Sequence, residues 1–172
     1  MEEVADEIKV PYERIGVIIG KTGEVKKKIE KECGVKLFID SKSGLVVVER
    51  KTDVKDPLKA IKALDIVKAM ARGFSPQKAF KLLLPNYYLE IIDLTEYVSD
   101  KSLTRVRSRI IGRKGKAKRF IEAKTNTLIS IYGKTVAIIG DAESIELAKE
   151  AILKLIKGAK HVTVYRFLQT KT

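Results

Sequence analysis

Reactive side chains are scarce in this chain of 172 residues, which has one cysteine, one histidine and no tryptophan. Cys33 has no partner for an internal disulfide bond, and one cysteine with one histidine cannot form a Cys/His metal cluster. We therefore expect no metal and no cofactor. Cys33 stands beside Gly34 at a predicted helix end, which favours a small buried apolar side chain over a reactive thiol. We likewise expect His161 to be a structural or surface residue and not a catalytic one.

Long apolar runs are absent as well. No stretch approaches the ~20 apolar residues of a membrane-spanning helix, and the acidic N-terminus lacks the apolar core of a signal peptide. These absences predict a soluble, cytoplasmic protein that does not associate with membranes. Side-chain amides are limited to Gln77, Asn86, Asn126 and Gln169. Such scarcity, with abundant Lys, Glu, Ile and Val, is typical of proteins from hot habitats.

Acidic residues are outnumbered, with 22 Asp and Glu against 35 Lys and Arg and a net charge of +13. An excess of this size attracts polyanions and favours nucleic acid or an anionic membrane as a partner. A well-solvated surface of a thermophilic protein would give the same composition, so charge alone does not decide. Apolar residues make up 45% of the chain, which is enough for packed cores and excludes a disordered basic tail.

The most informative feature that is present is a repeat. Residues 18–23 read IIGKTG and residues 110–115 read IIGRKG, 92 positions later. Each segment ends an apolar helical stretch and opens a lysine-rich helix. Further along, Gly34 and Asn126 occupy matching positions. These residue types most readily adopt the left-handed conformation that ends a helix.

The repeat extends through a complete set of elements. Predicted strands cover residues 8–10, 35–39 and 45–48 in the first copy and 89–94, 127–131 and 136–139 in the second. Asp56, followed by proline, and Asp141 are predicted caps of a long closing helix, with Gly73 and Gly158 at the helix ends. The predicted order in each copy is strand, helix, Gly-x-x-Gly, helix, strand, strand, helix.

This order predicts an α+β fold in two domains joined by a linker. We expect residues 1–74 to form the first domain, 75–86 a helical linker, and 87–172 the second domain with a C-terminal extension. The apolar side chains of the linker need burial, which favours a packed spacer over a flexible tether. Residues 161–169 fit a short docked helix about as well as a strand, and we favour the helix.

The first loop shares Gly-Lys-Thr with the P-loop of nucleotide-binding proteins. That motif requires a glycine, four residues and then Gly-Lys-Ser/Thr, because consecutive backbone N–H groups must wrap the phosphates. Here Ile15 stands where the first glycine is required, and the second loop has no hydroxyl to hold magnesium. The sequence therefore argues against an ATP-binding enzyme.

A Gly-x-x-Gly turn between two helices suits a nucleic-acid backbone better. The glycines carry no side chain, so a sugar-phosphate strand can approach closely, and the N-terminus of the next helix directs N–H groups at it. Bases would lie across an aliphatic groove floored by the isoleucine pair before each loop and by the adjoining strand. Aromatic residues, at 6%, are too few around the loops for a stacking platform.

Both copies resemble type I KH domains, whose Gly-x-x-Gly loop clamps about four nucleotides. Residues 15–23 (IGVIIGKTG) are close to the family signature, and the second copy departs from it by Ser108 where the first has Gly16. The tandem layout and residues 73–75 and 109–116 are similar to the archaeal two-KH pre-rRNA processing proteins. Their eukaryotic counterpart is the small-subunit assembly factor called partner of Nob.

The resemblance implies an antiparallel three-stranded sheet backed by helices in each domain, and a non-enzymatic role in small-subunit (16S-type) rRNA maturation and ribosome assembly. The implied partners are single-stranded RNA near the 3′ end of that rRNA, and the endonuclease that trims it or another ribosome-associated protein. The acidic residues Glu2, Glu3, Asp6 and Glu7 look solvated and do not form a nuclease centre. A general single-stranded nucleic-acid regulator, an RNA-degradation adaptor or a protein scaffold with inactive KH folds remain as alternatives.

Charge distinguishes the two copies. Residues 101–124 hold ten basic residues and one acid, whereas the matched window 9–32 holds seven basic residues and four acids. Attraction to phosphates scales with such charge, so we expect the second copy to be the main RNA grip. A solvated helix face would also explain Arg105, Arg107 and Arg109. The candidate RNA-binding residues are Arg109, Ile111, Gly112, Arg113, Lys114, Gly115, Lys116, Lys118 and Arg119 in the second copy and, more weakly, Ile19, Gly20, Lys21, Thr22, Gly23, Lys26 and Lys27 in the first.

Overall fold

The computed structural model of the protein describes residues 5–51 and 56–172. The chain forms two compact units, Met1–Leu84 and Pro85–Thr172. Of the acidic N-terminal residues, Glu2 and Glu3 lie outside the described part. In that part, no helix is long and apolar enough to cross a membrane.

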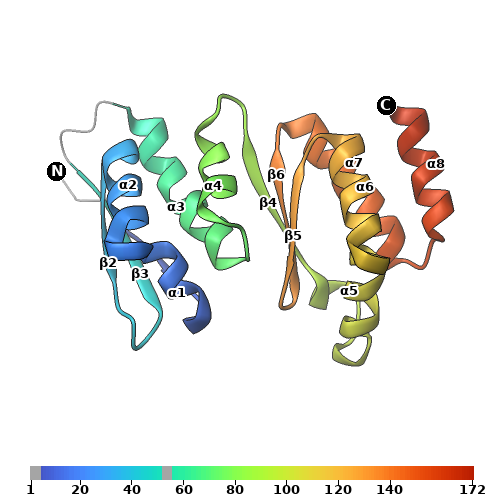
Figure 1. The fold of residues 1–172 in the computed structure, drawn as a ribbon, viewed down its shortest axis with the longest axis horizontal. Helices are drawn as coiled ribbons and strands as arrows, with labels where there is room; N and C mark the ends of the chain where they lie inside the picture. Colours follow the sequence, from blue (N-terminus) through green and yellow to red (C-terminus); the bar gives the residue numbers. More distant parts are fainter. Residues whose placement is uncertain (1–4, 52–55) are drawn as a thin grey trace. The chain divides into compact units, whose positions relative to one another are not determined.

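The first unit has a three-stranded antiparallel sheet in the order β1-β3-β2. Its elements are β1 (Ala5–Lys9), α1 (Tyr12–Ile19), α2 (Glu24–Cys33), β2 (Val35–Ile39), β3 (Leu45–Arg50), α3 (Pro57–Ala71) and α4 (Pro76–Ala79) (Figure 1). A 3₁₀ turn, Lys21–Gly23, joins α1 to α2.

The second unit repeats this topology with the sheet order β4-β6-β5 and adds one helix. Its elements are β4 (Tyr88–Asp93), α5 (Leu103–Ile111), α6 (Lys116–Thr125), β5 (Leu128–Tyr132), β6 (Thr135–Gly140), α7 (Ala142–Ile156) and α8 (His161–Lys171). The predicted order of strands and helices is confirmed in both copies. So is the predicted α+β fold.

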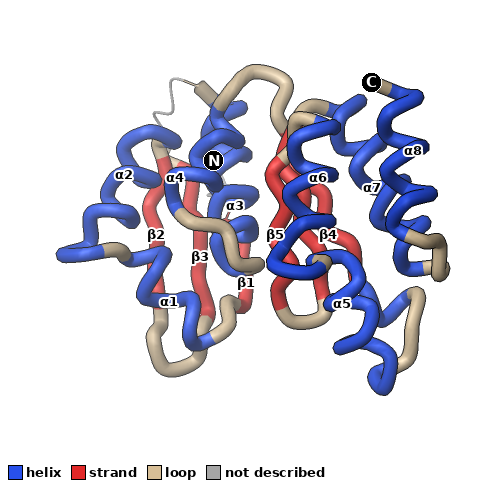
Figure 2. The backbone as a smooth tube through the Cα atoms, turned by 45° about the vertical axis from the view of Figure 1, so that its right-hand side comes forward, coloured by secondary structure: helices blue, strands red, loops and turns tan. Residues whose placement is uncertain are grey.

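In each unit the helices lie along one face of the sheet (Figure 2). The alternation of buried Val35 and Leu37 with exposed Lys36 and Phe38 turns one side of β2 toward the helices. On that side Leu37 pairs with the buried Val48 of β3. The core of each unit therefore lies between its sheet and its helices.

The predicted helix boundaries have the expected physical causes. The Asp56 carboxylate accepts a hydrogen bond from the Leu58 N–H at 3.1 Å, and Asp141 accepts one from the Ser144 N–H at 2.9 Å. At the ends of α2 and α6, Gly34 (φ 67°) and Asn126 (φ 53°) adopt the left-handed conformation. The sequence predicts these caps because each depends on residues that are close together in the chain.

The segment after α3 packs on the first unit. Both α4 and the following 3₁₀ turn, Phe80–Leu83, contact α3, and Ala79 and Leu82 are fully buried. The Lys28 ammonium of α2 lies 4.4 Å from the centre of the Phe80 ring. The division between the two units falls after Leu84, beyond the short helix.

Helix α8 settles the ambiguity at residues 161–169, where the favoured helix is confirmed. It contacts α6 and α7, buries Val164 and Leu168 completely, and brings Tyr165 against Phe120 with 4.1 Å between ring centres. The last helix is thus part of the core of the second unit.

Candidate nucleic-acid interface

The two Gly-x-x-Gly loops have the same backbone conformation. Gly20 has φ 75° and ψ 173°, and Gly112 has φ 76° and ψ 172°. The third residues of the motif, Thr22 (φ 55°) and Lys114 (φ 54°), are both left-handed, as are the closing glycines. The sequence repeat is therefore a repeat of a turn.

The first glycine of each loop is required by its surroundings. A methyl group on Gly112 would lie 2.6 Å from the Ala117 nitrogen, and one on Gly20 would lie 2.4 Å from a methyl carbon of Val25. Their φ and ψ values also fall in a region that is essentially restricted to glycine. The loop backbone therefore passes directly over the start of the next helix with no side chain between them.

The one departure from the family signature has a simple explanation. Gly16 and Ser108 each use their backbone carbonyl to accept the N–H of the first loop glycine, at 2.9 and 2.8 Å. A methyl group built on Gly16 meets nothing within 4 Å. Because the space is open and the contact is made by backbone, serine serves at this position as well as glycine.

The central side chains of both loops point away from the core. Lys21, Thr22, Arg113 and Lys114 are all exposed. The Thr22 hydroxyl donates a hydrogen bond to the Lys21 carbonyl at 2.6 Å. The first loop thus presents one cation at its tip and the second presents two.

The second loop also has a side-chain support that the first lacks. Arg119, in the second turn of α6, donates a hydrogen bond from Nη1 to the Lys114 carbonyl at 2.5 Å. A methyl group on Gly115 would lie 2.8 Å from Nη1 of the Arg119 guanidinium. Arg119 therefore adds a third cation to the loop and holds its backbone.

The remaining predicted residues flank the loops on the following helices. Lys116, Lys27 and Arg119 are exposed, and Lys118 and Lys26 are half-buried. Glu24, directly after the first loop, is exposed and reduces the positive charge there. The positive charge predicted for the second loop is therefore at the surface.

The isoleucine pair before each loop divides between core and surface. Ile18 and Ile110 are fully buried, whereas Ile19 and Ile111 keep part of their surface. The expectation that both isoleucines floor a groove is therefore wrong for Ile18 and Ile110. Because consecutive helical residues are ~100° apart around the helix, only one of the two can leave the core.

Arg109 has a different environment from the other predicted residues. Its guanidinium donates a hydrogen bond to the Ala159 carbonyl, between α7 and α8. The Arg109 carbonyl in turn lies 2.8 Å from Nε2 of His161, at the start of α8. The residue expected to bind RNA thus ties the end of α5 to the C-terminal extension. This pairing joins positions 50 and 52 residues apart, so no local pattern could have indicated it.

Two glutamates that the sequence analysis did not single out hold the helix after each loop to the edge strand of the sheet. A carboxylate oxygen of Glu30 accepts the Leu37 N–H at 3.0 Å, and one of Glu122 accepts the Ile129 N–H at 2.9 Å. The signal that could have revealed them is the repeat itself, because Glu30 and Glu122 are also 92 positions apart. They position α2 and α6 relative to β2 and β5.

Family models recognise both copies. Residues 88–172 match the eukaryotic type KH-domain (KH-domain type I), and residues 5–62 match the KH domain. The chain belongs to the KH-domain family. Its two KH domains have the three-stranded antiparallel sheet and the Gly-x-x-Gly loop that the sequence resemblance implied.

Curated relatives come from archaea and eukaryotes. KH domain-containing protein MJ0443 of Methanocaldococcus jannaschii is 49% identical over 94% of this chain and 71% of its own length. Pre-rRNA-processing protein pno1 of Schizosaccharomyces pombe is 31% identical over 76% of this chain and 56% of its own length. The similarity thus runs through both KH domains.

A solved structure shares the fold at high similarity. A chain in the crystal structure of the a/eIF2alpha–aDim2p–rRNA complex from Pyrococcus horikoshii OT3 has a TM-score of 0.94 and 48% identity. The match covers 98% of this chain and 94% of the other. The crystal structure of Dim2p from the same organism matches with a TM-score of 0.92 and 49% identity over 97% of this chain and 99% of that chain. This two-KH-domain protein is therefore similar to archaeal Dim2p as well as to eukaryotic PNO1.

Proposed function

We propose that this protein is a non-enzymatic RNA-binding protein that acts in small-subunit rRNA maturation and ribosome assembly. It grips the sugar-phosphate backbone of single-stranded RNA with its Gly-x-x-Gly loops, mainly in the second KH domain. The RNA segment lies near the 3′ end of the small-subunit rRNA, and the protein presents it to a separate endonuclease.

The observation that carries this proposal is the architecture of the second loop. Its backbone has no side chain at Gly112, two exposed cations at its tip and the N-terminus of α6 directly behind it. Helix N-termini attract phosphates through free N–H groups and a positive dipole end. Arg119 holds the loop through the Lys114 carbonyl, so these groups are positioned before RNA arrives.

The similar proteins support the choice of rRNA as the ligand. The names of two of them refer to pre-rRNA processing and to a complex with rRNA. A KH fold needs no catalytic residues for this role, because clamping four nucleotides of backbone is a binding function. The chemistry of cleavage falls to the endonuclease partner.

Sequencing RNA crosslinked to the protein in its native cells tests this proposal. The expected result is enrichment of reads near the 3′ end of small-subunit rRNA, with loss of the crosslinks in an Arg113→Asp/Lys114→Asp variant. Reads spread over messenger RNAs would instead support the general regulator or degradation adaptor. A protein that crosslinks to no RNA would contradict RNA binding altogether.

A further inference from the structure

A second candidate binding site lies in the first KH domain, at the end of α1 opposite the Gly-x-x-Gly loop. It is a pocket of about 420 Å³. Its wall is formed by residues 9–12 at the junction of β1 and α1, residues 42–44 of the β2–β3 turn, and Arg72 after α3. Its volume falls within the ~300–1,000 Å³ typical of ligand pockets.

Backbone contacts hold the wall of this pocket in place. The Val10 N–H donates to the Gly44 carbonyl at 2.8 Å, and a methyl group on Gly44 would lie 2.5 Å from the Val10 oxygen. The Arg14 guanidinium donates to the carbonyls of Met70 and Phe74, both at 2.8 Å, and so ties α1 to the end of α3. The pocket is therefore preformed.

The lining combines positive charge with an exposed aromatic ring. Lys9, Lys42 and Arg72 contribute three cations, and no residue of the lining is acidic. Tyr12 is 77% exposed, the most exposed large apolar side chain of the described residues. Proteins that bind single-stranded nucleic acid commonly combine aromatic rings, on which bases stack, with cations that bind the phosphates.

The acidic groups nearby offset only part of this charge. Asp40, before the β2–β3 turn, accepts hydrogen bonds from the Lys42 N–H at 3.0 Å and from the Ser43 hydroxyl at 2.8 Å. The Ser43 hydroxyl chiefly, and the Lys42 N–H after it, lower the pKa of Asp40, so its carboxylate stays negatively charged and is held within the turn. Glu13 follows Tyr12 and is exposed, but neither Glu13 nor Asp40 lines the pocket, whose wall carries three cations and no acid.

The matching corner of the second KH domain is built differently. There the Leu94 N–H donates to the Lys134 carbonyl at 2.8 Å, as Val10 does to Gly44. However, 18 positions separate Leu94 from its loop glycine, against 10 between Val10 and Gly20. The longer connection between β4 and α5 contains two 3₁₀ turns, Leu94–Glu96 and Asp100–Ser102.

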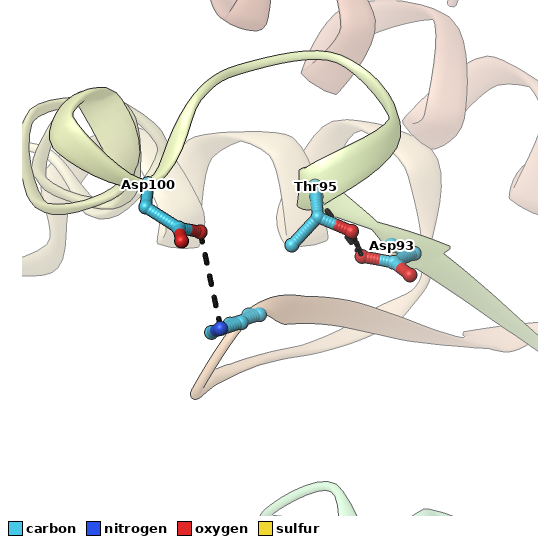
Figure 3. Close-up of polar contacts among 4 residues, drawn as sticks. Asp93, Thr95 and Asp100 are labelled. Carbon is cyan, nitrogen blue, oxygen red and sulfur yellow. Dashed lines mark hydrogen bonds and ion pairs between the residues drawn. The ribbon is translucent and has the colours of Figure 1, made fainter.

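Two acids lie at this corner of the second domain, Asp93 at the end of β4 and Asp100 in the second 3₁₀ turn. The Asp100 carboxylate pairs with the Lys134 ammonium at 3.8 Å, and the Asp93 carboxylate accepts from the Thr95 N–H at 2.9 Å and from its hydroxyl at 2.6 Å (Figure 3). The basic pocket is therefore a property of the first domain and not of the shared fold.

We propose that this pocket binds one further nucleotide of the RNA, with its base on the Tyr12 ring and its phosphate among Lys9, Lys42 and Arg72. The inference rests on the proposed RNA-binding function and adds a contact outside both Gly-x-x-Gly loops. With this pocket, the less basic first domain would contribute to RNA affinity, which the charge of its loop does not predict.

Affinity measurements on single-stranded RNAs of increasing length, from about four to about sixteen nucleotides, test this proposal with the full chain. Tyr12→Ala is expected to weaken binding of the longer RNAs about tenfold, since one stacked base contributes ~1–3 kcal/mol. Tyr12→Phe should retain the affinity because the ring remains. Tyr97→Ala, at an exposed tyrosine of the second domain, is the matched control and should leave the affinity unchanged.

Crosslinking provides a readout that does not depend on affinity. An RNA carrying 4-thiouridine should form adducts that map to residues 9–14, and these should disappear in a Lys42→Glu/Tyr12→Ala variant. Unchanged affinity of Tyr12→Ala at every length, while Arg113→Asp/Lys114→Asp still loses binding, would overturn the pocket and leave the RNA-binding function intact. Adducts of this surface with an acidic protein instead of RNA would overturn it equally.

Discussion

At the scale of single residues, Gly112 is the position of the second loop where a substitution should be most harmful. Gly112→Ala brings a methyl group to 2.6 Å from the Ala117 nitrogen and forces alanine into a backbone region used almost only by glycine. We expect a loss of about 1–3 kcal/mol in the free energy of unfolding, measured by urea denaturation.

Gly115→Ala is the internal comparison for this substitution. Its methyl group would meet only the flexible end of Arg119, and its left-handed conformation costs alanine about 1 kcal/mol. Equal stability of the two variants, or a Gly112→Ala protein as stable as the parent, would contradict the close packing of the loop on α6.

Cys33 allows a second test at this scale. It is 1% exposed, and its pKa is raised to about 11, chiefly by burial and secondarily by the nearby Glu32 carboxylate. The thiol is therefore protonated and shielded in the folded protein, so iodoacetamide at pH 8 should label it only after unfolding in urea. Because the folded pKa lies above the ordinary value of 9.0, stability should fall as pH rises from about 9 toward 11. Rapid labelling of the native protein would contradict the burial.

At the scale of elements, α8 and the end of α5 act as one unit through Arg109. Arg109→Ala removes the bond to the Ala159 carbonyl and should cost about 1–3 kcal/mol of stability, since a charged group makes it. Amide hydrogen exchange should become faster in α8. RNA affinity should fall less than in Arg113→Ala. A large loss of RNA affinity with unchanged amide hydrogen exchange in α8 would instead show that Arg109 binds RNA directly.

A structural feature could be predicted from the sequence when the residues that cause it are close together in the chain. Asp56, Asp141, Gly34 and Asn126 mark helix ends through bonds within a few residues, and the sequence predicts them. The repeat predicts both loops because the same turn recurs. The role of Arg109 and the basic pocket beside Tyr12 depend on residues about 30 to 60 positions apart, which no local pattern connects.

At the scale of the whole molecule, the net charge of +13 should make RNA binding strongly dependent on salt. If about four phosphates are neutralised at the loop, the logarithm of affinity should fall with the logarithm of salt concentration at a slope near −3. Arg113→Ala/Lys114→Ala should reduce the magnitude of this slope by about one to two. A slope near zero, from fluorescence anisotropy at several salt concentrations, would show that the phosphates are not the main contact.

The central claim is that the second Gly-x-x-Gly loop is the main grip on RNA, and matched double substitutions test it most directly. Arg113→Asp/Lys114→Asp and Lys21→Asp/Thr22→Asp change equivalent positions, and aspartate tolerates the left-handed conformation of Lys114 and Thr22. With folding verified by circular dichroism, the first variant should lose RNA binding and the second should lose much less. Unchanged affinity in the first variant, or an equal or larger loss in the second, would contradict the account.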